Sequence, residues 1–311
     1  MAVVVLVGPT AAGKSQLGVA VAQRLAAAEQ PAEVVNADSM LVYRGMDIGT
    51  AKPTMAERGG VPHHLIDVLD VRETATVADF QHRARAAITD CHDRGVVPVL
   101  VGGSALYVRA IVDDFRFPGT DPMLRAELEA ELAANGPELL HRRLSELDPA
   151  SAAQILPGNG RRVVRALEVI ALTGDPFTAT LPSRHYALPG VLQVGLDIAR
   201  PRLDQRIAER VDRMWAAGLV AEVRRLADAG LREGRTASRA LGYRQVLAYL
   251  DGELTEEEAR TRTVVATRRF ARRQDSWFRK DPRIVWLPFD RTDLADTVVA
   301  LAAAPLAGVP D

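Results

Sequence analysis

The feature that most constrains the fold is a glycine-containing run near the N-terminus, Gly8-Pro9-Thr10-Ala11-Ala12-Gly13-Lys14-Ser15. It follows Val3 to Val7, a continuous apolar run typical of a strand buried on both faces of a parallel sheet. Leu17, Val21 and Leu25 then recur at helical spacing. A run of this form between a strand and a helix is a P-loop, whose backbone N–H groups form a cradle for phosphate.

We therefore predict that Gly8 to Ser15 binds the phosphates of a small substrate, with Lys14 neutralising their charge and Ser15 as a Mg²⁺ ligand. Nucleoside triphosphatases also carry an acidic residue at the end of a buried strand. The best candidate strand, Val97 to Val101, ends instead at Gly102-Gly103-Ser104. That omission weakens the ATPase and GTPase interpretations and favours a smaller phosphate substrate.

Strand and helix patterns alternate through most of the chain, which predicts an α/β fold: a three-layer P-loop core with a mostly parallel sheet. Further strands are expected at 34–35, 65–68, 96–101, 191–198 and 284–287, and helices at 77–94, 201–217, 220–229, 237–250 and 255–280. Residues 113–189 show helical patterns and little strand pattern, so we predict an inserted all-helical subdomain. The core is then 1–112 and 190–311, including the C-terminal helices.

Three helices are expected within the insertion. Asp121-Pro122 is a typical helix start and Asn135-Gly136 a typical end. Leu140, Leu144 and Leu147 mark a second helix, and a third runs from about Val163 to Gly174.

The single cysteine, Cys91, excludes an internal disulfide and a multi-cysteine zinc site, and it fits a reducing cytosol. We expect Cys91 to be a small buried residue. His63 and His64 are expected to pack in the interior, and we assign them no metal. The start of the chain is expected to be a strand rather than a signal peptide, and no apolar stretch is long enough to span a membrane.

Basic residues are concentrated near the C-terminus. Of 39 basic residues 36 are arginines, and the stretch from Arg260 to Lys280 holds eight basic residues against one acid, Asp275. In a chain of net charge −1, such a one-signed stripe favours contact with a polyanion such as nucleic acid. The alternative is a solvated face balanced by acidic residues of the insertion.

Asp38 follows the second predicted strand, whose carboxyl end faces the P-loop in a doubly wound sheet. A carboxylate there can remove a proton from a nucleophile. The alternative is that Asp38 caps the next turn, and the residues alone leave both interpretations open.

The run Asn36-Ala37-Asp38-Ser39-Met40-Leu41-Val42-Tyr43-Arg44-Gly45-Met46-Asp47-Ile48-Gly49-Thr50-Ala51-Lys52-Pro53 resembles the signature of bacterial tRNA dimethylallyltransferases. Further matches are Pro62 to Asp67, Val101 to Tyr107, Arg165 to Val169 and Leu241 to Gln245, so the resemblance spans nearly the whole chain. Two positions depart from many members, which have Gln at Leu41 and Thr at Ser104. Ser104 keeps the hydroxyl, whereas Leu41 loses a polar group that could contact RNA.

The resemblance implies transfer of a dimethylallyl group from dimethylallyl diphosphate to N6 of adenosine 37 in tRNA, with Mg²⁺ as cofactor. Asp38 would be the general base, and Lys14 and Ser104 would act at the reacting diphosphate. N–H groups from Thr10 to Ser15 would stabilise the leaving group. Arg206 and Arg210 lie one helical turn apart, so one of them could reach the diphosphate, and we choose Arg206. The alternative is an ordinary solvated pair.

The resemblance also implies that the insertion grips the anticodon stem-loop and that the target base is extruded into a pocket. The expected tRNA contacts are Asp38, Ser39, Met40, Leu41, Ser104, Arg125, Asn159, Gly160, Arg161, Arg162 and Val163. Arg125 could instead be an ordinary surface charge. We expect a cytoplasmic enzyme, monomeric, with no membrane partner. The competing hypotheses are a small-molecule P-loop kinase and a non-catalytic RNA-binding module with a vestigial P-loop.

Overall fold

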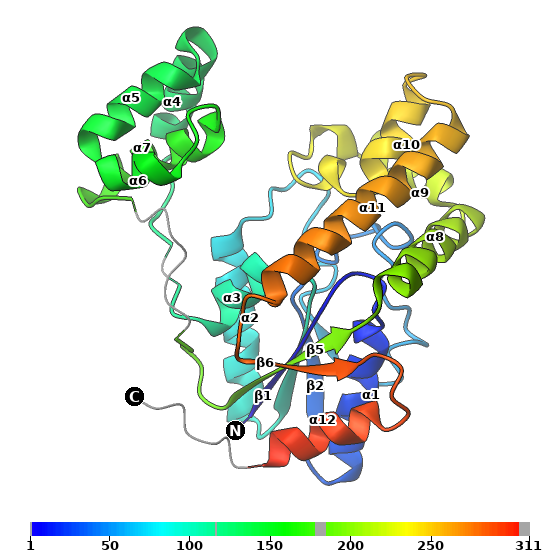
Figure 1. Cartoon of the computed structure of the whole chain (residues 1–311). Coiled ribbons are helices and arrows are strands. Elements are labelled where there is room, and N and C mark those ends of the chain that lie inside the picture. Colours follow the sequence, from blue (N-terminus) through cyan, green and yellow to red (C-terminus); the bar gives the residue numbers. More distant parts are fainter. Residues whose placement is uncertain (1, 116, 178–184, 305–311) are drawn as a thin grey trace. The chain divides into compact units, whose positions relative to one another are not determined.

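The computed structural model describes residues 2–115, 117–177 and 185–304. The chain divides into two compact units: a core unit of residues 1–112 and 186–311, and a helical unit of residues 113–185 (Figure 1). Each unit has its own hydrophobic core.

The core unit is built on a six-stranded sheet with the order β3-β2-β4-β1-β5-β6, and every pairing in it is parallel. The α/β class predicted from the sequence is therefore confirmed. The strands are β1 (Val3–Val7), β2 (Ala32–Asn36), β3 (His63–His64), β4 (Val97–Val101), β5 (Val191–Asp197) and β6 (Ile284–Pro288).

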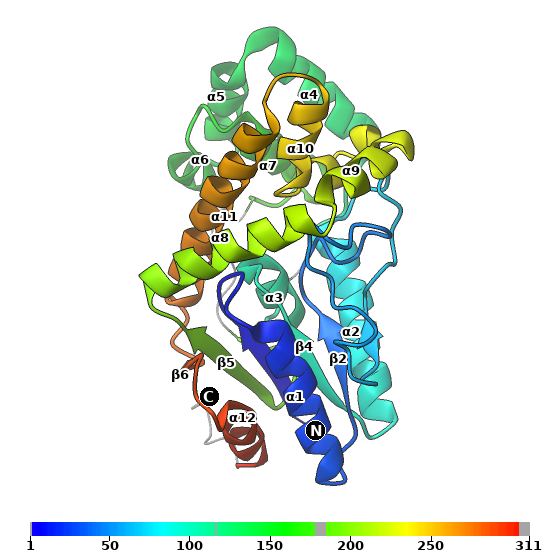
Figure 2. The ribbon, with the colours of Figure 1, turned by 90° about the vertical axis from the view of Figure 1, so that its right-hand side faces the viewer.

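Alternate residues of the central strand β1 enter two different cores, because successive side chains point to opposite faces of a sheet. Val3, Val5 and Val7 pack with α2 (Val77–Asp93) and α3 (Ala105–Val112). Val4 and Leu6 pack with α1 (Lys14–Ala27) and α12 (Leu294–Ala303) on the other face (Figure 2). These two helical layers around one sheet form the predicted three-layer core.

The core unit also contains four α-helices and two short 3-10 helices: α8 (Arg200–Ala216), α9 (Leu219–Asp228), η1 (Leu231–Glu233), η2 (Ala237–Arg239), α10 (Tyr243–Leu250) and α11 (Glu256–Phe278). One helix predicted over 237–250 is thus two pieces. Gly242 separates them with a φ of 86°, outside the helical region. Helices α3 and α12 were not predicted from the sequence.

The strand predicted at 65–68 was wrong. Strand β3 is His63–His64, and the chain then leaves the sheet because Leu65 and Asp67 have φ values of 61° and 59°. Left-handed residues cannot continue a strand ladder. The turn places the carbonyl of Leu65 next to the Asn36 side chain, which donates to it at 3.0 Å.

The helical unit contains the three predicted helices and one more, in the order α4 (Pro122–Asn135), α5 (Pro137–Leu147), α6 (Pro149–Gln154) and α7 (Gly160–Thr173). The Asp121 side chain caps α4 by accepting from the backbone of Met123 and Leu124. The unit ends at His185 rather than at the predicted residue 189, because Ala187 donates to the carbonyl of Val112 at 2.8 Å in the core unit.

None of the helices in the described ranges combines the length and hydropathy that a membrane-spanning helix needs. Helix α12 ends at Ala303, and residues 305–311 lie outside the described part of the chain.

Candidate phosphate-binding and catalytic site

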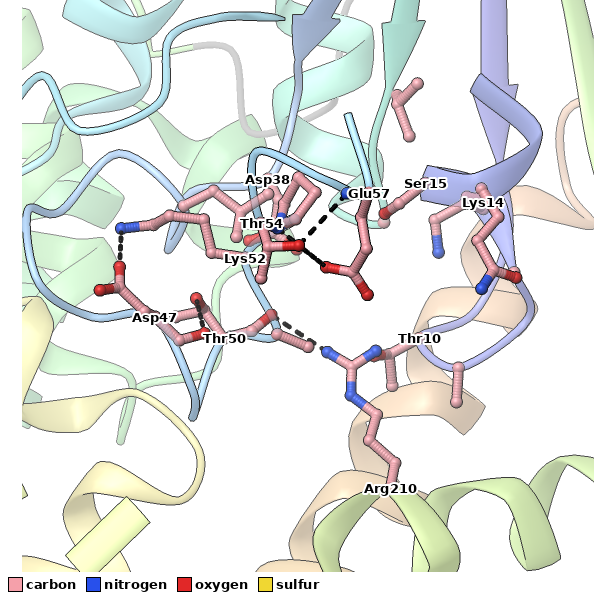
Figure 3. Close-up of a pocket in the computed structure, with 18 of the residues that line it drawn as sticks. Thr10, Lys14, Ser15, Asp38, Asp47, Thr50, Lys52, Thr54, Glu57 and Arg210 are labelled. Atoms are coloured by element: carbon pink, nitrogen blue, oxygen red, sulfur yellow. Dashed lines mark hydrogen bonds and ion pairs between the residues drawn. The ribbon is translucent and has the colours of Figure 1, made fainter. Parts of the chain in front are cut away.

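A pocket of about 820 Å³ opens at the carboxyl ends of β1, β2 and β4, where ligands bind in open parallel sheets (Figure 3). Helix α8 and the segment 47–54 supply further walls. The sequence-predicted residues that line this pocket are Thr10, Ala11, Gly13, Lys14, Ser15, Asp38, Leu41 and Arg206. The fold therefore brings the P-loop and the candidate base to one cavity.

The P-loop backbone turns at Gly8 and Gly13, whose φ values of 138° and 102° favour glycine. Its amides do not all face the pocket. The Thr10 N–H donates to Gln274 Oε1 at 2.8 Å, and the Ala12 N–H donates to the carbonyl of Pro9 at 3.3 Å. The cradle predicted from Thr10 to Ser15 is thus narrower, because the Thr10 amide is used to attach the loop to α11.

Lys14 is half-buried at the pocket, with its Nζ donating to the carbonyl of Pro9 at 2.8 Å. Burial lowers the pKa of Lys14 to about 8; the Asp38 carboxylate opposes this shift, and Arg210 adds to it. An anion bound in the pocket would lie next to this ammonium group and would stabilise its charged form.

Arg206 and Arg210 both line the pocket from α8, so the pair left open by the sequence lies on one face of the helix. Arg206 Nε donates to the carbonyl of Ala11 at 2.8 Å, and Arg210 Nη2 donates to the carbonyl of Thr50 at 3.1 Å (Figure 3). Burial lowers the pKa of Arg210, and Asp38 opposes that shift. Both guanidinium groups are placed to complement an anion at the P-loop.

Asp38 combines both interpretations that the sequence left open. Its Oδ1 accepts the Met40 N–H at 2.9 Å, which is the turn-capping contact. The residue also lines the pocket opposite Lys14 and Ser15 (Figure 3). Asn36 fixes this turn from both sides, accepting from the Asp38 N–H at 2.8 Å and donating to the Asp38 carbonyl at 2.9 Å. A carboxylate held this rigidly suits a general base.

The end of β4 has no room for the acidic residue of a nucleoside triphosphatase. A Cβ on Gly102 would lie 2.5 Å from the carbonyl oxygen of Ala37. Gly102 and Gly103 line the pocket. Ser104, which was expected at the diphosphate, is not among the lining residues; its carbonyl accepts the Val108 N–H at 2.9 Å at the start of α3.

Sequence reasoning missed two buried polar residues that organise the site. Gln274 donates to the carbonyl of Gly103 at 2.6 Å while accepting from Thr10, so it joins two loops of the pocket. Lys52 Nζ donates to the carbonyl of Tyr43 at 2.8 Å and to the carboxylates of Asp47 and Asp67 at 2.7 and 2.5 Å.

A signal existed for Lys52, which is one of three lysines in the chain and stands in the signature run. Nothing in the arginine-rich sequence around Gln274 distinguished it.

Among the other expected tRNA contacts of the core unit, Leu41 lines the pocket, and Ser39 and Met40 lie in the same turn as Asp38. In the helical unit, a separate hollow of about 650 Å³ is lined by Gly158, Asn159, Gly160, Arg161, Arg162 and Arg165. Asn159 caps α7, at whose N-terminus this hollow lies. Helix N-termini and arginines both favour anions.

Two expected tRNA contacts also have structural roles. The Val163 side chain is fully buried in the core of the helical unit, and its contact with RNA stays a prediction. Arg125 forms an ion pair with the fully buried carboxylate of Glu168, which Arg165 also contacts at 2.6 Å. Arg125 is therefore not the plain surface charge considered as the alternative, and its contact with RNA stays a prediction.

The basic stripe of α11 is partly neutralised within the core unit. Arg260 pairs with Asp212 at 2.8 Å, Arg279 pairs with Asp197, and Arg268 donates to the carbonyl of Asp204 at 3.1 Å. Four other arginines of the stripe are exposed: Arg262, Arg269, Arg272 and Arg273. The acids that balance the stripe thus come from β5, α8 and α11 itself, where Glu257 and Asp275 pair with Arg260 and Arg279. A positive surface remains along α11.

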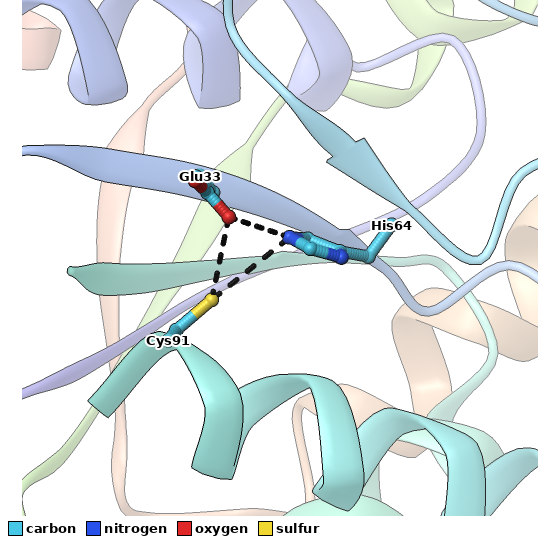
Figure 4. Close-up of side chains that lie close together, drawn as sticks. All are labelled: Glu33, His64 and Cys91. Atoms are coloured by element: carbon cyan, nitrogen blue, oxygen red, sulfur yellow. Dashed lines mark hydrogen bonds and ion pairs between the residues drawn. The ribbon is translucent and has the colours of Figure 1, made fainter. Parts of the chain in front are cut away.

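Glu33, His64 and Cys91 form a second polar cluster (Figure 4), the one group of three potential metal ligands in the described residues. His64 Nε2 lies 2.7 Å from Glu33 Oε2, and Arg94 donates to both Glu33 oxygens at 2.8 and 2.7 Å. Burial raises the pKa of the Cys91 thiol to about 11. Because a guanidinium already holds the carboxylate and the thiol stays protonated, this is an ion-pair cluster.

Comparisons with known proteins agree with this geometry. A family model described as IPP transferase matches residues 41–281. The tRNA dimethylallyltransferase of Thermobifida fusca is 65% identical over 299 residues, which cover 96% of this chain and 93% of that protein.

Solved structures are similar over the whole chain. The tRNA isopentenylpyrophosphate transferase of Bacillus halodurans is 42% identical with a TM-score of 0.69, covering 97% of this chain and 94% of that one. A eukaryotic dimethylallyltransferase, described as acting on tRNA, is 28% identical with a TM-score of 0.80, covering 97% of this chain and 77% of that one. This chain therefore belongs to the IPP transferase family.

Proposed function

We propose that this chain transfers the dimethylallyl group of dimethylallyl diphosphate to N6 of adenosine 37 in tRNA. The observation that carries the proposal is the single pocket in which a P-loop with Lys14 faces Asp38, with Arg206 and Arg210 alongside. The relatives named tRNA dimethylallyltransferase support the choice of reaction and substrate.

The chemistry divides between the two sides of the pocket. Breaking the allylic C–O bond leaves negative charge on the diphosphate, which Lys14, the arginines and the remaining P-loop amides stabilise. The adenine amino group is a weak nucleophile because its lone pair is delocalised into the ring. Asp38 accepts one of its hydrogens through the carboxylate oxygen that is not bound to Met40, so the proton leaves as the new C–N bond forms.

Mg²⁺ is the cofactor that this site fits. Ser15 is exposed at the start of α1 and lines the pocket, so its hydroxyl is available as an oxygen ligand beside the diphosphate site. The ion would neutralise charge on the leaving group.

We propose that tRNA is held by two basic surfaces, one on each unit. The first is the exposed arginine face of α11, and the second is the hollow at the start of α7 with Arg161 and Arg162. Both consist of arginines, which bind phosphate groups bidentately. We also propose a monomer working in the cytosol, a setting that suits one buried free thiol; light scattering with and without tRNA measures the oligomeric state.

The experiment incubates the protein with Mg²⁺, dimethylallyl diphosphate and unmodified tRNA, then digests the tRNA and measures nucleoside masses. Prenylated adenosine supports the proposal, and its absence beside an active relative used as control refutes it. A parallel incubation with ATP and without tRNA tests the small-molecule kinase hypothesis, which requires ATP turnover under these conditions.

A further inference from the structure

Glu222 is a buried carboxylate on α9 that the proposed reaction does not use; its exposed fraction is 6%. Its Oε2 accepts the backbone N–H groups of Asp47 and Ile48 at 3.1 and 2.8 Å, and its Oε1 accepts that of Gly49 at 3.2 Å. The Tyr243 hydroxyl donates to Oε1 at 2.6 Å. Four donors from two parts of the chain, residues 47–49 and Tyr243, therefore converge on one anion.

Residues 47–49 wrap around this carboxylate as successive N–H groups do around a bound anion. Burial and the Glu222 carboxylate raise the pKa of Tyr243, so its hydroxyl remains a donor. The ring of Tyr243 also supports the segment, because a Cβ on Gly49 would lie only 2.4 Å from it. The segment is therefore held by hydrogen bonds to Glu222 and by packing of Gly49 against the Tyr243 ring.

The same segment forms a wall of the donor pocket. Ile48 and Thr50 line the pocket, as does Met214 of α8. Arg210 of α8 donates to the carbonyl of Thr50, so the segment is attached to the pocket at that end as well. The position of Ile48 is thus set by the Glu222 carboxylate, which takes no part in the proposed reaction.

We propose that Glu222 and Tyr243 are positioning residues that fix the wall at Ile48 and thereby limit the length of the prenyl chain that the pocket accepts. The P-loop end of the pocket is charged, so a bound prenyl chain must extend toward the apolar side chains, Ile48 and Met214 among them. This inference rests on the proposed function. It also gives Tyr243, which stands in the Leu241 to Gln245 run, a defined task.

The test compares kcat/KM for dimethylallyl diphosphate with kcat/KM for the ten-carbon geranyl diphosphate, using the full chain and tRNA. Glu222→Gln places an amide NH₂ among N–H donors and releases the segment. We expect the preference for the five-carbon donor to fall about tenfold, the size typical of discrimination by an apolar pocket wall. Tyr243→Phe removes one of the four donors, and we expect a smaller fall, roughly threefold.

Two controls separate positioning from a general loss of stability. Asp228→Asn makes the same chemical change at an exposed position of α9, and Val298→Ala loosens the buried core under α12 on the opposite face of the sheet. Both are expected to keep the wild-type preference. If Glu222→Gln does not fold, Tyr243→Phe decides the question.

Amide hydrogen exchange at residues 47–49 gives a second readout that needs no prenyl transfer. Exchange there is expected to accelerate in Glu222→Gln and to stay slow in Asp228→Asn. A wild-type donor preference in the folded variants overturns the specificity role, and unchanged exchange overturns the positioning role. A wild-type protein that prenylates nothing overturns the proposed function, and with it the specificity role, whatever the exchange shows.

Discussion

Replacing Gln274 by alanine should both destabilise the protein and impair the pocket. The side chain is 5% exposed and pairs with the Thr10 N–H at 2.8 Å and the Gly103 carbonyl at 2.6 Å. Each buried backbone group left without a partner costs about 1–3 kcal/mol. Thr10 lies at the pocket, where water can partly replace the lost contact, so we expect a loss of about 2–4 kcal/mol in the free energy of unfolding.

Urea denaturation of the wild type and Gln274→Ala measures this loss. The matched control is Gln205→Ala, because Gln205 is exposed and its amide contacts only Arg202 and Glu209 on its own helix. We expect that control to stay within about 0.5 kcal/mol of the wild type. If Gln274→Ala is equally stable, the argument from unpaired backbone groups is refuted.

The same variant tests how closely the two loops must be aligned. Gln274 is the side chain that contacts both the P-loop and the loop after β4. A displacement of about 1 Å at an active site can reduce the rate about 100-fold, so we expect a fall of that order in kcat/KM for dimethylallyl diphosphate. Activity within a factor of two or so of the wild type would mean that other contacts already hold the loops in register.

Three further predictions concern charge and catalysis. Asp38→Asn keeps the acceptor for the Met40 amide but removes the base, so kcat should fall about 10²–10⁴-fold. Single-turnover rates measure this, and a small loss would give Asp38 the turn-capping role alone. The pKa of Lys14 is lowered to about 8, so the free enzyme loses this positive charge as the pH rises above 8. The KM for dimethylallyl diphosphate should therefore increase there, and it should not in Lys14→Arg; a flat wild-type profile up to pH 9.5 or so contradicts the assignment. Arg272→Gln should lower the slope of log tRNA affinity against log salt by about one, if this exposed residue of α11 touches a phosphate. An unchanged slope would return the stripe to the solvated-face interpretation.

The strands and the P-loop were predictable because their signals are local. Val3 to Val7 must be buried on both faces, and a Gly-Lys-Ser run after such a strand has few alternative structures. The strand predicted at 65–68 failed for a reason that is not local. Its apolar residues suit a strand, but Asn36 holds the Leu65 carbonyl in a turn, and hydrophobic pattern does not report such a contact.

The residues of the candidate site that could be predicted are those that stand in a recognisable local motif. Lys14 was identified from the P-loop pattern alone. Asp38 was identified as a base only through the resemblance to a family, because the residues alone also allowed a turn-capping role. Gln274 and Glu222 could not be identified in either way, since their tasks exist only after distant segments meet: Gln274 joins the P-loop to α11, and Glu222 joins the segment 47–49 to α9 and α10. A buried polar group that satisfies backbone N–H groups is invisible in one sequence, because its partners are amides that every residue possesses.

The charged residues that line the pocket are oriented by buried polar residues behind them. Lys14, Asp38 and Arg210 lie on three separate elements: α1, the turn after β2, and α8. Each forms a hydrogen bond with a backbone group, of Pro9, Met40 and Thr50 respectively. Their alignment depends on neutral or fully paired groups behind them: Asn36 behind Asp38, Gln274 behind the P-loop and Glu222 behind the segment that receives Arg210. Charges that face a substrate cannot also neutralise one another, so the framework that orients them must come from groups whose hydrogen bonds are satisfied within the protein.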